Sequence, residues 1–159
     1  MSLFLRVCVA VVVCGLSAPL AGAQTGVEAA ERWGLLGTWM ADCRKQPSLA
    51  NNRDAYVVRG GRLFLERDLG PQFGRDSTAI TLATLGPEGT IELAEYYSDL
   101  SPPQMRRTTF VKAGDGRIRV WTNVDLDTGA HSVRNGRLTS SGRPTPWQDR
   151  CWLMPQGQS

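Results

Sequence analysis

The sequence has little of what metal and hydrolase sites are commonly built from, because histidine occurs once, at His131, and cysteine four times. A zinc site takes its ligands from closely spaced cysteines or histidines, and no such pair accompanies His131. Ser132 and Ser141 lie outside any G-x-S-x-G setting, so a serine hydrolase is not indicated. We therefore expect a non-catalytic protein without metal or cofactor.

Charge of one sign and long apolar runs are also scarce. Lysine and arginine total 18 and the acidic residues 15, and the two signs are mixed along the chain without a basic run. Nucleic-acid-binding domains carry a basic stripe or patch, so we expect no nucleic-acid partner. No stretch after residue 23 is apolar over the roughly 20 residues that a membrane-spanning helix needs.

The N-terminus has the layout of a secretory signal peptide. A short head with one basic residue, Arg6, precedes an apolar run that ends in small residues up to Ala23. We expect cleavage after Ala23, which leaves residues 24–159 as one mature domain in the periplasm or outside the cell. Lipidation at Cys14 is the alternative, but three valines precede this cysteine where a small residue is expected.

Removal of the signal leaves two cysteines, Cys43 and Cys151. In an exported chain, two thiols most simply form one disulfide. Such a bond closes nearly the whole mature chain into a loop, for which the chain-entropy model gives about 4–5 kcal/mol. Two free buried thiols are the alternative.

Short alternating segments and turn signals follow a brief stretch of helix formers at residues 27–33. Gly60-Gly61 and Asn135-Gly136 are typical of tight β-hairpins. Short connections favour antiparallel neighbours, and closing a meander of about eight strands into a barrel removes its exposed edges. We therefore predict an all-β up-and-down barrel, with strands in residues 38–43, 55–59, 62–67, 78–85, 90–97, 105–112, 117–125, 130–134 and 137–141.

Gly37, Thr38 and Trp39 begin the first predicted strand, after the short helical stretch. This G-T-W resembles the G-x-W signature of the lipocalin and calycin group. The resemblance implies a calycin-like barrel whose closed end is plugged by Trp39, with Gly37 allowing a tight bend and Arg143 or Arg150 covering the Trp. From the residues alone, Trp39 also fits an ordinary core position.

Two longer patterns are similar to the ends of small exported bacterial proteins of unknown function. They are G-T-W-x-x-D-C, which ends at Cys43, and S-S-G-R-P-T-P-W-x-x-x-C, which ends at Cys151. The resemblance implies no activity. It implies that the two cysteine-bearing segments meet, so that a Cys43–Cys151 bond staples the first strand to the last at the seam of the barrel.

Alternation in residues 117–125 predicts one face with Ile118, Val120 and Val124 and another with arginines, Trp121 and Asn123. If the polar and aromatic face points inward, an arginine there can pair with a carboxylate or phosphate. We then expect the protein to bind a small apolar or amphipathic ligand. The alternative is an envelope structural or interaction protein, or an inhibitor, that acts through its surface and has a filled core. The candidate ligand residues are Tyr97, Arg107, Arg119 and Trp121.

Asp127, Thr128 and Gly129 resemble the active-site loop of retropepsin-type aspartic proteases, in which Asp127 would be catalytic. That family places the loop early and follows it with a flap and a second glycine motif, and neither follows here. Asp125 and Asp127 also match part of a calcium loop, whose later glutamate is missing. We expect this segment to be a plain turn and His131 to lie on the surface.

Overall fold

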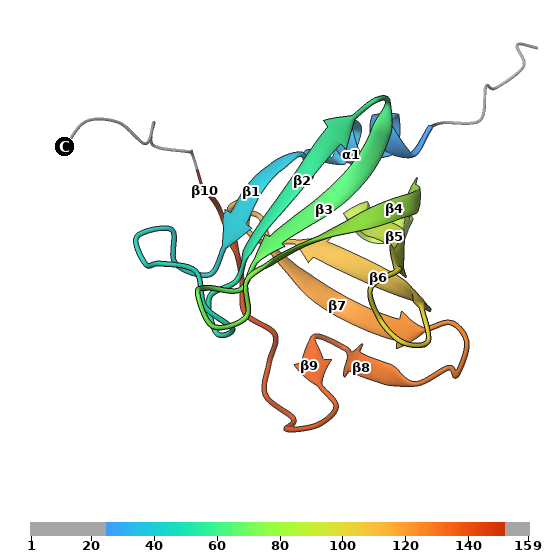
Figure 1. The fold of residues 1–159 in the computed structure, drawn as a ribbon. Coiled ribbons are helices and arrows are strands. Elements are labelled where there is room, and N and C mark those ends of the chain that lie inside the picture. Colours follow the sequence, from blue (N-terminus) through green and yellow to red (C-terminus); the bar gives the residue numbers. More distant parts are fainter. Residues whose placement is uncertain (1–24, 152–159) are drawn as a thin grey trace, which may run out of the picture.

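The computed structural model describes residues 25–151, and the signal-peptide prediction for residues 1–23 falls outside the described residues. Within these residues the chain forms one short α-helix and a sheet of ten strands, so the predicted all-β class is confirmed (Figure 1). The elements are α1 (Gly26–Trp33), β1 (Gly37–Met40), β2 (Arg53–Arg59), β3 (Arg62–Asp68), β4 (Arg75–Leu85), the 3-10 turn η1 (Pro87–Gly89), β5 (Ile91–Tyr97), β6 (Gln104–Lys112), β7 (Ile118–Asp125), β8 (His131–Arg134), β9 (Arg137–Leu138) and β10 (Asp149–Cys151).

Helix α1 is fixed at both ends by local hydrogen bonds. The Thr25 hydroxyl accepts from the Glu28 amide at 3.2 Å, and the Glu28 carboxylate accepts from the Thr25 amide at 3.0 Å. This reciprocal pair is a capping box, which satisfies amides that the first turn leaves free. The helix ends at Gly34, whose φ of 80° only glycine adopts at little cost.

All neighbouring strands of the described sheet are antiparallel. For the strands from β2 to β9, which are neighbours in sequence, this follows from connections too short for a parallel crossover. Gly60 and Gly61 turn the chain between β2 and β3 with φ of 55° and 73°. Asn135 and Gly136 do the same between β8 and β9 with φ of 51° and 68°. Both hairpins were expected from these dipeptides, whose positive φ values give the twist that a tight hairpin needs.

The predicted closure into a barrel is wrong. The strand order runs from β10 through β1 to β9, so the sheet has two ends and is rolled without a closing ladder. One isolated bridge, between Ile118 and Gln148, joins the residues before β10 to β7. Pro144 and Pro146 precede this bridge and lack amide hydrogens, which limits further pairing there. We call the result the rolled sheet.

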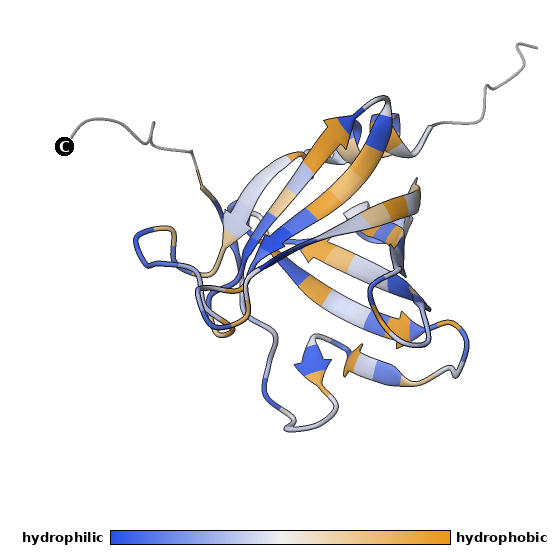
Figure 2. Ribbon diagram, viewed as in Figure 1, coloured by the Kyte–Doolittle hydropathy of each residue, from blue (hydrophilic) through white to orange (hydrophobic). Residues whose placement is uncertain are grey.

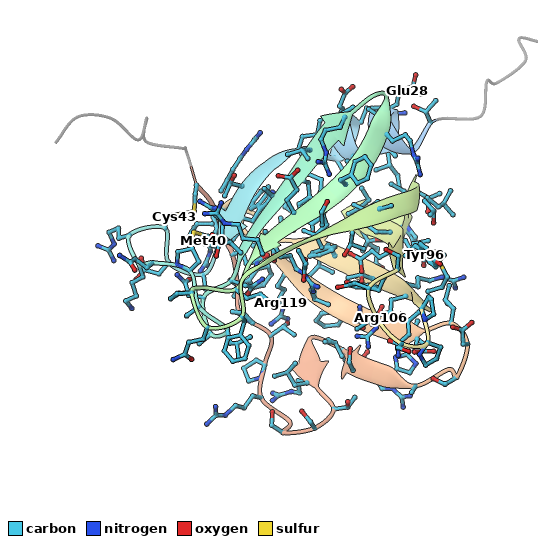
Figure 3. All side chains as sticks on the ribbon, in the orientation of Figure 1. Glu28, Met40, Cys43, Tyr96, Arg106 and Arg119 are labelled. Carbon is cyan, nitrogen blue, oxygen red and sulfur yellow. A yellow bond between two sulfur atoms is a disulfide. The ribbon has the colours of Figure 1, made fainter. Side chains whose placement is uncertain are left out.

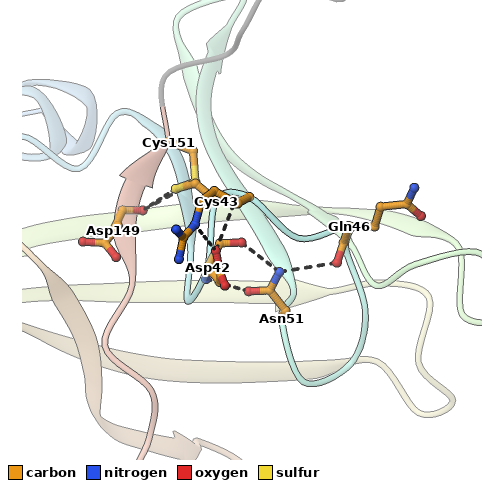
Figure 4. The surroundings of a disulfide bond; sticks show 7 residues. Asp42, Cys43, Gln46, Asn51, Asp149 and Cys151 are labelled. Atoms are coloured by element: carbon orange, nitrogen blue, oxygen red, sulfur yellow. Dashed lines mark hydrogen bonds and ion pairs between the residues drawn. A yellow bond between two sulfur atoms is a disulfide. The ribbon is translucent and has the colours of Figure 1, made fainter.

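The Cys43–Cys151 disulfide forms as expected (Figure 4). It ties the connection that follows β1 to the last described residue of β10, whose strand pairs with β1. The Asn51 side chain supports the same connection, since it donates to the Asp42 carbonyl at 3.1 Å and accepts from the Asp42 amide at 2.8 Å. Disulfides persist in oxidising compartments, so the bond fits a protein that works outside the cytoplasm.

Buried apolar residues from α1 and from the strands form one cluster inside the rolled sheet. Figure 1 shows α1 beside this sheet, and Figure 2 shows hydrophobic positions along its strands. This burial is the main favourable term in folding. The buried core consists of Ala29, Ala30, Trp33, Leu35, Trp39, Tyr56, Leu63, Leu65, Ile80, Ala83, Ile91, Leu93, Phe110 and Ile118.

Candidate functional site

Trp39 lies at the end of the rolled sheet that α1 covers. Its ring is 2% exposed, and its indole Nε1 donates to the Leu35 carbonyl at 2.7 Å. Arg150 from β10 lies over the ring, with its guanidinium carbon 6.0 Å from the ring centre. Gly37 has φ of 131°, and a Cβ there would lie 2.9 Å from Arg150 Nε. Gly37 therefore makes room for the arginine that covers Trp39.

The other half of the interior is polar and is centred on Glu95, which is 2% exposed. Its Oε2 accepts from the Thr108 hydroxyl at 2.7 Å and from the Tyr97 hydroxyl at 3.2 Å. Asn123 on β7 donates to the same Thr108 oxygen at 2.7 Å. This chain of hydrogen bonds links three neighbouring strands through their inner faces.

Asp54 on β2 is the second buried carboxyl group of this half, at 8% exposure. Its Oδ2 accepts from the side-chain amides of Gln148 at 2.9 Å and Asn52 at 2.6 Å. Its Oδ1 has no hydrogen-bond partner among the described residues. Arg67, next to Asp54 in the sheet register, is held instead by two hydrogen bonds to Asp76 at 2.9 and 2.6 Å.

Burial raises the pKa of both carboxyl groups above the ordinary values. For Glu95 the hydrogen bonds from Thr108 and Tyr97 oppose the rise, and for Asp54 those from Gln148 and Asn52 oppose it. A carboxyl group with a raised pKa takes up a proton more readily, because the charged form has lost its water. The polar half of the interior is therefore sensitive to pH.

Glu95→Gln is expected to change how stability depends on pH. In the wild type, the raised pKa of Glu95 contributes to the free energy of unfolding. This contribution is complete below the ordinary glutamate pKa of 4.5, and it is lost as pH rises through the higher pKa of the folded state. The variant has no such charge, so its stability relative to wild type should increase with pH above 4.5. Urea unfolding from acid to neutral pH measures this, with Glu92→Gln on the outer face of β5 as the control. A difference that stays constant with pH would contradict the account.

Side chains from opposite walls meet inside the rolled sheet. The rings of Tyr56 on β2 and Phe110 on β6 pack edge to face with centres 6.0 Å apart. On the polar side, the Arg67 guanidinium lies 5.2 Å from the centre of the Tyr97 ring, which Arg106 also approaches at 5.6 Å. A small rolled sheet can be filled in this way by its own side chains. These contacts bring side chains from opposite walls together across the interior.

The structure separates the residues that were predicted to bind a ligand. Tyr97 lies in the interior, whereas Arg107 lies on the outer face and pairs with Glu92 at 3.3 Å. Arg119 on β7 (Figure 3) has its guanidinium near the rings of Trp121 and Trp147, 5.2 and 4.5 Å from their centres, and its Nε is buried without a hydrogen-bond partner among the described residues. This stack packs the segment before β10 against β7.

The segment that resembles a protease loop forms a turn. Asp125 Oδ1 accepts from the amides of Asp127 and Thr128 at 3.0 and 2.8 Å, and Gly129 has φ of 71°. This is the geometry of an Asx turn, in which an aspartate side chain caps the amides that follow it. His131 is half-buried, so it does not project freely from the surface. Among residues 25–151, no cluster of three potential ligands could hold a metal ion.

A surface groove between two connections had not been predicted from the sequence. Its volume is about 580 Å³, and it lies between residues 41–52 and 69–74. Leu49 and Phe73 are 58% and 57% exposed beside it. Single apolar residues in segments rich in proline, glycine and asparagine were the only signal, and such residues are common on surfaces.

Comparisons with known proteins return no match to a family model, to a curated protein or to a solved structure. Within the described residues, no helix is long and apolar enough to cross a membrane.

Proposed function

We propose that the protein is exported and acts through its surface, as a non-catalytic interaction protein with a filled core. The observation that carries this proposal is the contact between opposite walls of the rolled sheet, where Tyr56 packs on Phe110. The Cys43–Cys151 disulfide and the signal layout support export. The exposed side chains of Leu49 and Phe73 supply an apolar surface of the kind that marks interaction sites.

Site-specific photo-crosslinking in the source cells tests this function. A benzophenone amino acid at Leu49 or Phe73 is expected to form adducts, and one at Leu82 is expected to form none. Leu82 is the matched control because it is 52% exposed on β4, away from the groove. Native mass spectrometry of residues 24–159 should show the protein alone. Equal adducts at all three positions, or a small molecule retained in the interior, would contradict the proposal.

A second candidate function is binding of a small amphipathic ligand through a cationic group. The observation that favours it is Asp54 Oδ1, a buried carboxylate oxygen without a partner. A ligand ammonium group would satisfy this oxygen and lower the cost of burying the charge. Such a ligand would have to displace the side chains that now fill the polar half, and it would be seen as the retained small molecule of the previous experiment.

A further inference from the structure

The loops that connect consecutive strands differ between the two ends of the rolled sheet. Because consecutive strands run up and down, every second connection lies at the same end of the sheet. At one end these are the β1–β2, β3–β4, β5–β6 and β7–β8 connections. Each exposes one large apolar side chain, with exposed fractions of 58, 57, 38 and 39%. The connections at the other end contain no large apolar residue. They are formed by residues 60–61, 86–90, 113–117 and 135–136. The four apolar side chains are, in order, Leu49, Phe73, Leu100 and Leu126.

Two of these connections pack against each other (Figure 1). A Cβ at Gly70 would lie 2.5 Å from the Pro47 carbonyl oxygen, so only glycine permits this approach, and the φ of 86° there also requires it. The groove between them is largely apolar. Its apolar lining residues are Pro47, Leu49, Ala50, Leu69, Pro71 and Phe73. We call this surface the apolar tip.

Backbone hydrogen bonds hold both parts of the apolar tip in shape. Ser48 and Asn51 exchange two such bonds, of 3.2 and 3.0 Å. In the other connection, the Gly74 amide donates to the Gly70 carbonyl at 2.8 Å and the Leu69 amide donates to the Gly74 carbonyl at 2.9 Å. Binding through a surface that is already ordered costs little conformational entropy.

Three exposed basic side chains belong to or directly follow the two connections of the apolar tip, and each forms an ion pair. Arg44, Lys45 and Arg75 have exposed fractions of 92, 74 and 75%. Their acidic partners, Asp42 and Asp68, are only 26 and 13% exposed. Residues 41–52 and 69–75 contain one acidic residue, Asp42, against the three cations. The tip therefore presents two apolar side chains together with three cations that are more exposed than their acidic partners.

We propose that the apolar tip docks on the surface of an anionic lipid bilayer, an inference that rests on the proposed function. Leu49 and Phe73 enter the interfacial layer, and Arg44, Lys45 and Arg75 contact lipid phosphates. Binding of this kind scales with buried apolar area and with attraction to anionic lipids. The exposed cations are what select an anionic lipid surface as the occupant, because they outnumber the acidic residues of the tip and are more exposed than those residues.

Vesicle sedimentation with oxidised residues 24–159 tests the docking. The wild type should bind vesicles of phosphatidylcholine with phosphatidylglycerol and bind pure phosphatidylcholine much more weakly. The Leu49→Ser, Phe73→Ser double variant should lose about tenfold or more in partitioning, because two apolar side chains no longer leave water. The Arg44→Gln, Lys45→Gln, Arg75→Gln variant should lose the preference for anionic vesicles, by about fivefold for each cation. Leu82→Ser is the control and should bind like the wild type.

Three results would overturn the docking. They are no binding to anionic vesicles, unchanged binding of the Leu49 and Phe73 double variant, and an equal loss with Leu82→Ser. Circular dichroism of each variant establishes that it is folded. If Leu49 forms crosslinks to another protein and the purified protein does not bind vesicles, the lipid docking fails and the proposed function stands. If a small molecule is retained in the interior and the crosslinks at Leu49 and Leu82 are equal, the proposed function fails as well.

Discussion

Replacing both Cys43 and Cys151 by serine is expected to lower the free energy of unfolding by about 4–5 kcal/mol. The two residues are 108 positions apart, so the bond removes a large loop-closure entropy from the unfolded chain. β10 pairs with β1 over three residues, and the segment before β10 is joined to β7 by one isolated backbone bridge, Ile118–Gln148, and by the Thr145 hydroxyl, which donates to the Val120 carbonyl at 2.7 Å. The last strand of the described chain therefore depends on the disulfide to stay in register.

Guanidinium unfolding of the oxidised wild type and of the Cys43→Ser, Cys151→Ser variant measures this effect. The wild type with its disulfide reduced is the control, and it should unfold at the same denaturant concentration as the variant. A loss below about 1 kcal/mol, within the usual range of surface substitutions, would show that the bond does not hold the rolled sheet together.

Trp39→Ala is expected to lower the free energy of unfolding by about 3–5 kcal/mol, because it removes a large ring from the buried core. The ring is 2% exposed, its Nε1 satisfies the Leu35 carbonyl, and Arg150 covers it. Alanine leaves a cavity, an unpaired carbonyl and an arginine without its aromatic partner. Trp39→Phe should cost less, since it retains most of the apolar ring and loses the hydrogen bond.

Trp147→Ala is the matched control for Trp39→Ala, because Trp147 is half-buried and stacks on Arg119 outside the core. Urea unfolding of the two alanine variants compares them directly. We expect Trp39→Ala to lower the free energy of unfolding clearly more than Trp147→Ala does. Equal losses of stability at the two positions would mean that Trp39 stabilises its end of the rolled sheet no more than a half-buried tryptophan does.

Local features of the fold could be predicted because single residues carry the physical reason. Gly60-Gly61 and Asn135-Gly136 supply the positive φ that tight hairpins need. Gly37 lies where the backbone has φ of 131°, next to the arginine that covers Trp39. The pairing of Cys43 with Cys151 was expected because removal of the signal leaves no other cysteine.

The inner lining could not be predicted, because β-bulges change which residues face inward. Alternation placed Arg119, Trp121 and Asn123 on one face. In the structure, Phe110 pairs with Val120 but Thr109 pairs with Thr122, so the register shifts at Trp121. The shift turns Asn123 to the inside, where it bonds to Thr108, while Arg119 stacks on Trp147. A bulge depends on pairing across strands, which alternation within one strand does not reveal.

The way the sheet closes and the apolar tip could not be predicted either, because both depend on contacts between segments that are distant in the sequence. Whether β10 meets β7 by a ladder or by one bridge depends on how the proline-containing segment before Gln148 crosses the sheet. The apolar tip arises only when residues 41–52 and 69–74 meet in space at Gly70. In the sequence, Leu49 and Phe73 are isolated apolar residues in two unrelated connections.

Nuclear magnetic resonance of labelled residues 24–159, titrated with anionic lipid nanodiscs, tests most directly the proposal that this protein acts through its outer loops and binds no ligand in its interior. The account predicts that signals of residues 43–52 and 69–75 broaden or shift, while those of Glu95, Thr108 and Phe110 stay unchanged. Perturbations confined to the interior, or none at any residue, would contradict it.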